Sequence, residues 1–356
     1  MRKSLILLVL VFGLLALAAC GNSNTSSSNQ GSSQNQDSGQ QQGSGEGQQE
    51  SAQLERTSLT VGSSVRDIGM LPLYVADQKG FFKEQGLDVT VQYFDSGSQH
   101  AQALAAGAID IGSGGFTEPM DAYVARRPIK AFWGLTNYPV YEWWASPDLK
   151  TLDDIKQKGK INVAVSRIGS LSHLISVYAF EGAGIDTDQY VNFVGLGGPG
   201  SRLAGLQSGQ VDVIPATPPG NFILEEQGYN LLISLQDIIE EFQYEVHYAS
   251  TDLLDNNPNT ITAFLKGISK ATDFIRENPE ESADILSEVV GYKPEELPDV
   301  IKAVEVMGPY FPADGHFALE GVDVLLQFYK ETGEFEEIPE HSELIDFSFT
   351  EKFQAN

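Results

Sequence analysis

Residues 106–115, AGAIDIGSGG, have a counterpart in residues 208–216, SGQVDVIPA. In both stretches a small residue and a glycine precede an aliphatic residue, an aspartate and a second aliphatic residue. A glycine at this place is typical of the left-handed end of a helix, and the aliphatic residues after it predict a short buried strand. The loop that follows is built of small residues, which let a ligand approach the backbone. The pair predicts a structural unit that occurs twice.

The similarity continues when the sequence is aligned with itself at a shift of 102 residues. About fifty positions align without a gap, and strands alternate with helices in the same order in both copies. Such alternation predicts mostly parallel sheets covered by helices. We therefore expect an α/β protein with two lobes, each built on one βαβαβ unit. The matched pairs are Val61 and Val163, Ser64 and Ser166, Gly80 and Gly182, Val89 and Val191, Leu104 and Leu206, Gly107 and Gly209, and Asp110 and Asp212.

Open sheets of this kind bind ligands at the carboxyl ends of their strands, so two facing sheets would enclose one cleft. We expect its walls to come from residues 63–67, 96–99 and 113–118 in the first copy and 165–169, 198–201 and 215–220 in the second. These segments are rich in Ser, Gly and Thr, which favour an oxyanion or another strong acceptor. The candidate ligand-binding residues are Ser64, Arg66, Ser96, Ser98, Gln99, Ser113, Gly114, Phe116, Glu118, Trp133, Tyr138, Ser166, Arg167, Ser170 and Thr217.

Two arginines each follow the first strand of one copy. Arg66 and Arg167 could grip a carboxylate or sulfonate from opposite sides, or they could be surface arginines paired with nearby acids. Arg202 begins a helix of the second copy, where we expect a solvated side chain. We expect Asp110 and Asp212 to bond turn amides rather than the ligand.

Five aromatic residues cluster where the two lobes should meet: Trp133, Tyr138, Tyr141, Trp143 and Trp144. We expect some of them in the core and at least one stacked on a planar or apolar part of the ligand. Glu118 is expected to cap a helix, although its carboxylate could also accept from a ring amino group.

The N-terminus has the features of a bacterial export signal. A basic start, MRKS, precedes an apolar run over residues 5–15 and the sequence LAAC at residues 17–20. The run is too short to span a bilayer. LAAC resembles a bacterial lipoprotein signal, in which the cysteine is acylated, and Cys20 is the chain's one cysteine. Residues 21–56 are dominated by Ser, Gln and Gly, which predicts a flexible linker to the membrane.

Composition argues against several function classes. With 49 acidic and 22 basic residues the chain carries a net charge of −27, so nucleic acid is not expected as a partner. There is no GxSxG or HExxH motif and no thiol after Cys20, and the five histidines lack short metal-ligand spacing. We expect no catalytic residues, no cofactor and no metal.

Five stretches together are similar to one family of proteins. PLYVADQKGFFKEQGLDVTV (72–91), the pair GAIDIG and GQVDVI, TLDDIKQKGKINVAV (151–165) and residues 257–286 resemble the solute-binding proteins of ABC importers for nitrate, sulfonates, taurine and thiamine pyrimidine precursors. The resemblance implies a two-lobed periplasmic-binding-protein fold whose chain crosses near residues 138–146 and 244–250. Lobe one would then comprise residues 57–145 and 249–356, and lobe two residues 146–248.

The resemblance also implies a function. We expect a monomeric, extracytoplasmic lipoprotein that binds a small organic anion by lobe closure and delivers it to an ABC permease. A neutral heterocycle such as a thiamine pyrimidine precursor is the alternative ligand. A biosynthetic enzyme or a sensor module on the same fold is the less favoured alternative.

Overall fold

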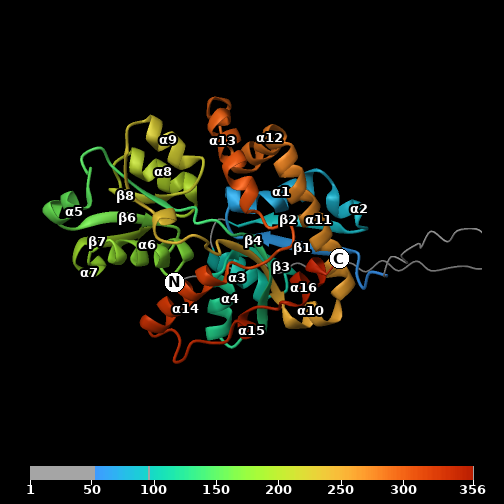
Figure 1. The fold of residues 1–356 in the computed structure, drawn as a ribbon. Helices are drawn as coiled ribbons and strands as arrows, with labels where there is room; N and C mark the ends of the chain where they lie inside the picture. The colour runs from blue at the N-terminus through green and yellow to red at the C-terminus, as the bar shows by residue number, and fades with distance from the viewer. Residues whose placement is uncertain (1–52, 95–96, 356) are drawn as a thin grey trace, which may run out of the picture. The chain divides into compact units, whose positions relative to one another are not determined.

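The computed structural model describes residues 53–94 and 97–355, with the side chains of residues 97 and 98 excepted. Cys20 and the export signal lie outside the described residues, as do residues 21–52 of the expected linker. The described part is built on two five-stranded sheets (Figure 1). The first has the order β2-β1-β3-β10-β4 and consists of β1 (Ser58–Ser63), β2 (Asp88–Tyr93), β3 (Ile111–Gly115), β4 (Ile129–Thr136) and β10 (Glu245–Ser250). The second has the order β7-β6-β8-β5-β9 and consists of β5 (Glu142–Ala145), β6 (Ile161–Val165), β7 (Val191–Gly195), β8 (Val213–Ala216) and β9 (Asn230–Ser234).

Helices cover both sheets. Those between the strands of the first lobe are η1 (Ile68–Met70), α1 (Leu71–Gln78), α2 (Phe81–Glu84), α3 (Gly97–Ala105) and α4 (Thr117–Val124). The second lobe contributes α5 (Leu152–Lys158), α6 (Leu171–Gly182), α7 (Thr187–Tyr190), α8 (Pro199–Gln207), α9 (Gly220–Glu226) and η2 (Leu235–Asp237). The C-terminal part adds α10 (Thr251–Asn256), α11 (Pro258–Glu277), α12 (Pro279–Val290), η3 (Pro294–Glu296), α13 (Leu297–Met307), η4 (Gly308–Tyr310), α14 (Leu319–Glu331), α15 (His341–Leu344) and α16 (Ser348–Gln354).

The two sheets have the same topology, which confirms the two-lobed α/β fold. In each, three parallel strands are followed by one antiparallel strand, which is the first strand after the chain has crossed between the lobes. These entering strands, β5 and β10, correct the expected boundaries. Residues 142–145 were assigned to lobe one but pair within the second sheet, and residues 245–248 were assigned to lobe two but pair within the first. Both errors have one cause: each of these strands pairs with strands that are distant in sequence, and such pairing leaves no local mark that shows where the chain crosses.

The two copies also agree in their contacts. Asp110 accepts a hydrogen bond of 2.8 Å from the amide of Thr60 and forms a 2.9 Å ion pair with Arg56. One repeat later, Asp212 accepts a 2.8 Å bond from the amide of Asn162 and pairs with a lysine, Lys158, at 2.8 Å. Both aspartates thus bond backbone amides, as expected, but the amides belong to the first strand of each copy, fifty positions earlier, and not to a nearby turn. The pairing of Arg56 also shows that the end of the expected linker belongs to the folded part.

Glycine ends the preceding helix in both copies, as the sequence predicts. Gly107 follows α3 with a φ of 69° and Gly209 follows α8 with a φ of 73°. Both angles lie in the left-handed region, where a side chain would strain the backbone. The chain can therefore turn directly from each helix into its third strand.

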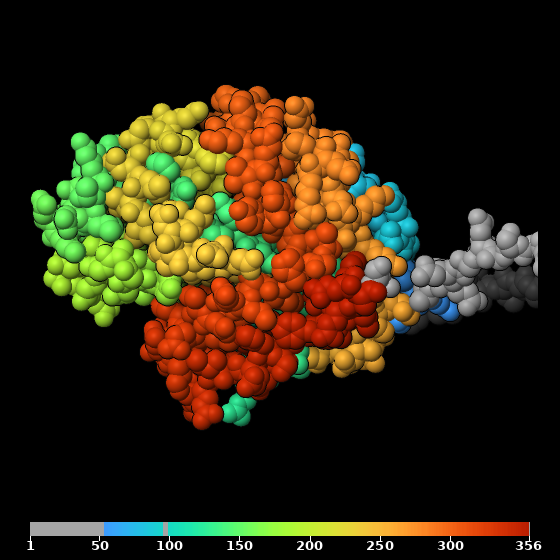
Figure 2. All heavy atoms as spheres, viewed as in Figure 1, coloured from blue at the N-terminus to red at the C-terminus, as the bar shows by residue number. Residues whose placement is uncertain are grey.

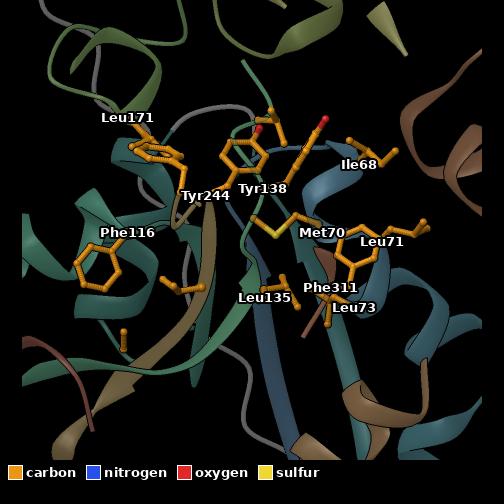
Figure 3. Packing of buried hydrophobic residues seen from close by; sticks show 14 of the residues in the cluster. Ile68, Met70, Leu71, Leu73, Phe116, Leu135, Tyr138, Leu171, Tyr244 and Phe311 are labelled. Carbon is orange, nitrogen blue, oxygen red and sulfur yellow. The ribbon is translucent and has the colours of Figure 1, made fainter. Parts of the chain in front are cut away.

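One hydrophobic core runs through both lobes. Its members include strands of both sheets, the crossing segments and the apolar face of α11. Figure 3 shows part of this core, in which Leu171 of α6 is drawn together with Tyr138 and Tyr244 of the crossing segments. Helices α1, α2, α11 and α12 pack together over the first lobe. Among the described residues no helix has the length and apolar character needed to cross a membrane.

Helix α13 reaches from the C-terminal part to the second lobe. In Figure 2 its orange atoms lie against the yellow atoms of the second lobe's helices. The contact includes Lys302 of α13, whose Nζ lies 3.9 Å from the ring centre of Phe222 in α9. The C-terminal helices therefore return to the first lobe, as expected, and also touch the second.

Candidate functional site

A cleft of about 420 Å³ lies where the carboxyl ends of the two sheets meet. Both lobes contribute to its walls, as the duplicated strand ends predict. Lobe one and the crossing segments contribute Ser64, Val65, Arg66, Asp67, Phe94, Gly115, Thr117, Glu118, Tyr141, Tyr244, Glu245 and Val290. Lobe two contributes Ser166, Arg167, Ser170, Leu171, Ser172, Leu196, Gly197, Gly198, Pro199, Gly200, Ser201 and Arg202.

The lobe-two wall carries hydrogen-bond donors. The helices α6 and α8 both begin at the cleft, and neither has a side-chain cap at its first turn. The first amides of a helix have no partner within the helix, and its dipole places positive charge there. Ser166 adds hydroxyl and amide groups that are linked to Ser170 and Ser172 at 2.8–3.1 Å. This wall is suited to a negatively charged group.

Arg202 corrects an expectation. The sequence predicts a solvated side chain, but only 3% of this residue is exposed, and it lines the cleft. Its Nη1 donates to the carbonyl of Gly197 at 3.1 Å, whereas its Nε finds no hydrogen-bond partner among the described residues. The other lobe covers Arg202, and the sequence of α8 alone could not reveal that cover.

The lobe-one wall carries two buried carboxyl groups whose oxygens are well supplied with donors. Asp67 accepts from the amide of Gly69 at 2.8 Å and from the hydroxyl of Thr217, in the opposite lobe, at 3.1 Å. Burial raises the pKa of Asp67, although its hydrogen bonds and the charge of Arg202 oppose this effect. A hydrogen bond therefore joins Asp67, in the lining of the cleft, to a buried residue of the second lobe.

Glu118 is the second of these carboxyl groups. It accepts from His100 at 2.8 Å and from the hydroxyls of Tyr248 and Ser64. Burial alone would raise the pKa of Glu118, but His100 and these hydrogen bonds hold it below the usual value. Gly114 leaves room for this arrangement, because a Cβ there would come within 2.5 Å of Glu118 Oε1 and Ser64 Oγ.

A third carboxyl group, Glu245, stands on the entering strand β10. Only 2% of the residue is exposed, and Oε2 has no hydrogen-bond partner among the described residues. Burial, together with the nearby acids Asp67 and Glu118, raises the pKa of Glu245 well above its usual value. Tyr141 and Tyr244 stand beside it in the cleft lining, with ring centres 5.3 Å apart.

The remaining two arginines of the cleft already have contacts within the protein. Arg167 Nη2 lies 3.3 Å from Asp121 in lobe one, and Asp121 also accepts from Tyr329 at 2.7 Å. The guanidinium of Arg66 lies 5.0 Å from the ring centre of Tyr93. Both arginines line the cleft, and Arg167 forms an ion pair that joins the lobes.

Six candidate residues lie in the cleft: Ser64, Arg66, Glu118, Ser166, Arg167 and Ser170. Thr217 reaches the floor of the cleft through its bond to Asp67. Ser96 lies outside the described residues, as does the side chain of Ser98. Gln99 is exposed and is not part of the cleft lining.

Four further candidates are buried away from the cleft lining. Ser113 bonds Nδ1 of His247 at 2.7 Å, and Phe116 is fully buried in the core. Trp133 packs edge-on against Phe353, and Tyr138 packs against Tyr310. The C-terminal segments that cover these two aromatic rings are distant in sequence. Of the five clustered aromatic residues, Tyr141 lines the cleft.

Several cleft residues were not among the candidates. Asp67 lies within one of the segments expected to form the cleft wall. Its position just before η1, where its side chain caps the helix, is the sequence feature that could have identified it. Tyr244 and Glu245 lie on the second crossing segment, for which the sequence predicts a connection between the lobes and not a part of the cleft wall. Within the described part of the chain, no group of three or more His, Cys, Asp or Glu side chains could hold a metal ion.

Known proteins share this architecture. The nitrate-binding protein NrtA from Synechocystis PCC 6803 superposes with a TM-score of 0.71 at 17% identity, covering 85% of this chain and 89% of NrtA. The aliphatic sulphonate-binding protein SsuA from Escherichia coli gives a TM-score of 0.65 at 21% identity, covering 82% of this chain and 92% of SsuA. These likenesses confirm the two-lobed fold of periplasmic binding proteins.

Sequence comparison points the same way. A protein from Brachyspira hyodysenteriae, named as a candidate ABC transporter periplasmic binding protein, is 23% identical over 293 residues, which cover 78% of this chain and 75% of that protein. The profile of the family described as NMT1/THI5 like matches residues 68–282. This match takes in both lobes and more than half of the chain, and the chain therefore belongs to the NMT1/THI5-like family.

Proposed function

We propose that this protein is the extracytoplasmic solute-binding component of an ABC importer. It captures a small organic anion in the cleft and delivers it to the permease, without a reaction of its own. The family match, the two-lobed fold and the Brachyspira relative support this role. Sulphonate and nitrate, named for two structural neighbours, are examples of the anionic class.

The observation that carries the anionic assignment is the donor-rich wall of lobe two. The buried guanidinium of Arg202 stands beside the uncapped first turns of α6 and α8. A guanidinium and helix-terminal amides together are a strong combination for a carboxylate or sulfonate. Because the other wall belongs to the opposite lobe, the solute is fully enclosed only when the lobes close.

A neutral heterocycle remains the second candidate, and a specific observation favours it. Tyr141 and Tyr244 stand beside the buried acid Glu245 in the cleft lining. Aromatic faces beside a carboxyl group are suited to a planar ring that carries amino groups.

We propose that acylated Cys20 anchors the protein, as a monomer, to the outer face of the cell membrane. The support is the LAAC sequence at residues 17–20 and the polar stretch that follows it. Replacing Cys20 with Ala should release the protein into the medium. Retention of the variant at the membrane would contradict this mode of anchoring.

A thermal-shift screen tests the proposed function. The panel contains sulfonates including taurine, nitrate, bicarbonate, carboxylates and pyrimidines. At least one organic anion should raise the melting temperature with increasing concentration, because a ligand that binds the folded state stabilises it. The proposal fails if no compound shifts the melting temperature, or if the purified protein converts the compound that binds.

A further inference from the structure

Helix α13 makes a contact with the second lobe that lies outside the cleft lining (Figure 2). Lys302 of α13 places its Nζ 3.9 Å from the ring centre of Phe222, in α9. Neither residue lines the cleft. The contact joins a helix of the C-terminal part, which packs on lobe one, to a helix of lobe two. It therefore connects the two parts of the protein that move relative to each other on closure.

Both helices stand next to the cleft. Helix α9 begins at Gly220, shortly after Thr217, whose hydroxyl bonds a carboxyl group of the cleft lining. Helix α13 packs against α12, whose last residue, Val290, lines the cleft. The contact between Lys302 and Phe222 thus crosses the same boundary between the lobes as the cleft does. It is made when the lobes are together and is lost when they move apart.

This contact is attractive. The face of an aromatic ring carries partial negative charge, which attracts the ammonium group of a lysine. Phe222 is half-buried and packs against the hydrophobic core, so its ring offers a fixed face to Lys302. At an exposed position such a contact changes an equilibrium constant by a factor of about 2 to 5.

The same two helices also bring two acids near each other. Asp299 lies one turn before Lys302 on α13, and Glu226 lies one turn after Phe222 on α9. Burial raises the pKa of Asp299, the charge of Glu226 raises it further, and Lys302 opposes both effects. Two like charges that approach each other across the boundary between the lobes oppose closure. The contact between α13 and α9 therefore combines one attractive pair with one repulsive pair.

We propose that Lys302 and Phe222 form a latch between the closed lobes, and that they are positioning residues which raise the affinity for the solute without touching it. The inference rests on the proposed function, because it takes the solute to be captured by lobe closure. A solute that binds the closed form gains from each contact that exists only in that form. The lobes must part before the solute can leave, so the latch acts mainly on the dissociation rate.

Variants with opposite expected effects test the inference. Lys302→Met keeps an unbranched side chain and removes the charge. Its control is Lys270→Met, because Nζ of Lys270 lies 4.5 Å from the ring centre of Phe81 in a contact of the same kind within lobe one. Glu226→Gln removes the repulsion between the acids. Its control is Glu225→Gln, which removes the same charge from the neighbouring exposed position of α9.

Calorimetry measures the affinity of one probe for each variant, and stopped-flow fluorescence measures its dissociation rate. The probe is whichever of ethanesulfonate, taurine, propionate and nitrate raises the melting temperature of the unmodified protein most. Lys302→Met should bind the probe about 2- to 5-fold more weakly and release it faster by a similar factor. Glu226→Gln should bind it about 1.5- to 2-fold more tightly. Both control variants should bind the probe as the unmodified protein does.

Unchanged affinity in Lys302→Met, or an equal loss in Lys270→Met, would overturn the inference and leave the proposed function standing. Weaker binding in Glu226→Gln would also overturn it, because the acid pair would then favour closure. If none of the four compounds binds the unmodified protein, the proposed function fails and the inference fails with it.

Discussion

Thr217 of the second lobe donates a hydrogen bond of 3.1 Å to Asp67 of the first, across 150 positions of sequence. Both residues are buried, at 3% and 2% exposure. The bond therefore joins the two walls of the cleft from below. Burial raises the pKa of Asp67, and its hydrogen bonds oppose this effect. Each donor to this carboxyl group therefore contributes to the stability of the folded protein.

Removing this donor should loosen the contact between the lobes. Thr217→Val keeps the shape of the side chain and deprives Asp67 of one partner, so the free energy of unfolding should fall by about 1–3 kcal/mol. Urea denaturation measures the change. Thr272→Val is the matched control, because the buried hydroxyl of Thr272 bonds only the carbonyl of Ile268 within its own helix. Equal losses of unfolding free energy in both variants would contradict the prediction, because the bond between the lobes would then contribute no more than a bond within one helix.

The arginines of the cleft should contribute unequally to anion binding. Arg202 is buried and has an unused donor, whereas Arg167 is partly exposed and already paired with Asp121. Arg202→Met should therefore weaken the binding of an organic anion by about 1.5–3 kcal/mol, the usual contribution of a charge-assisted hydrogen bond. Arg167→Met should cost less than about 1 kcal/mol. Calorimetry on both variants tests the order, and a larger effect of Arg167 would move the anion site to the rim of the cleft.

His247 should make the protein less stable in acid. Burial between Phe132 and Phe264 lowers the pKa of His247 to about 3, compared with 6.5 for a free histidine. Between these values the unfolded chain binds a proton that the folded protein does not. Stability from this group is thus complete above pH 6.5 and falls, by up to roughly 1.4 kcal/mol per pH unit, as the pH decreases toward 3.

The measurement is the free energy of unfolding at pH 6.5 and at pH 5. His247→Gln should show a flatter dependence than the unmodified protein, whereas His341→Gln, at a partly exposed position, should retain it. Glu245 contributes the opposite slope in this range, because its pKa is raised by burial. It is unchanged in both variants, so the comparison isolates His247. An equal slope in His247→Gln would contradict the prediction.

The duplicated aspartates should be equally important for stability. Asp110→Asn and Asp212→Asn each weaken one bond to a strand amide and remove one ion pair, with Arg56 and with Lys158 respectively. Each should lower the free energy of unfolding by about 1–2 kcal/mol. Asp255→Asn, on the exposed side of α10, should change it by less than about 0.5 kcal/mol. A loss confined to one of the two repeat positions would mean that the copies no longer share this role.

These aspartates also mark what the sequence can predict. Within each βαβαβ unit, the cap glycine and the buried strand that follows it lie close along the chain, so a repeated pattern reveals them, whereas the partners of Asp110 and Asp212 lie fifty positions away and were not predicted. The entering strands β5 and β10 depend on pairing with distant segments, and their lobes were predicted wrongly. The same limit applies to the cleft. Arg202 is buried at the cleft between the lobes, and Trp133 is buried under C-terminal segments. In both cases the segments that cover the side chain are distant in sequence, so the residues next to it do not predict its burial.

We infer that the solute lies between the two lobes, so a bulky side chain placed in this space should block its binding. Gly200 lines the cleft, and a side chain there would meet no atom within 4 Å. Gly220, which likewise has free space around it, begins α9 outside the cleft lining. Calorimetry with the best anion from the screen should give one site and equal affinity for the unmodified protein and Gly220→Trp, and roughly 100-fold weaker binding for Gly200→Trp. Undiminished affinity in a correctly folded Gly200→Trp would contradict the account.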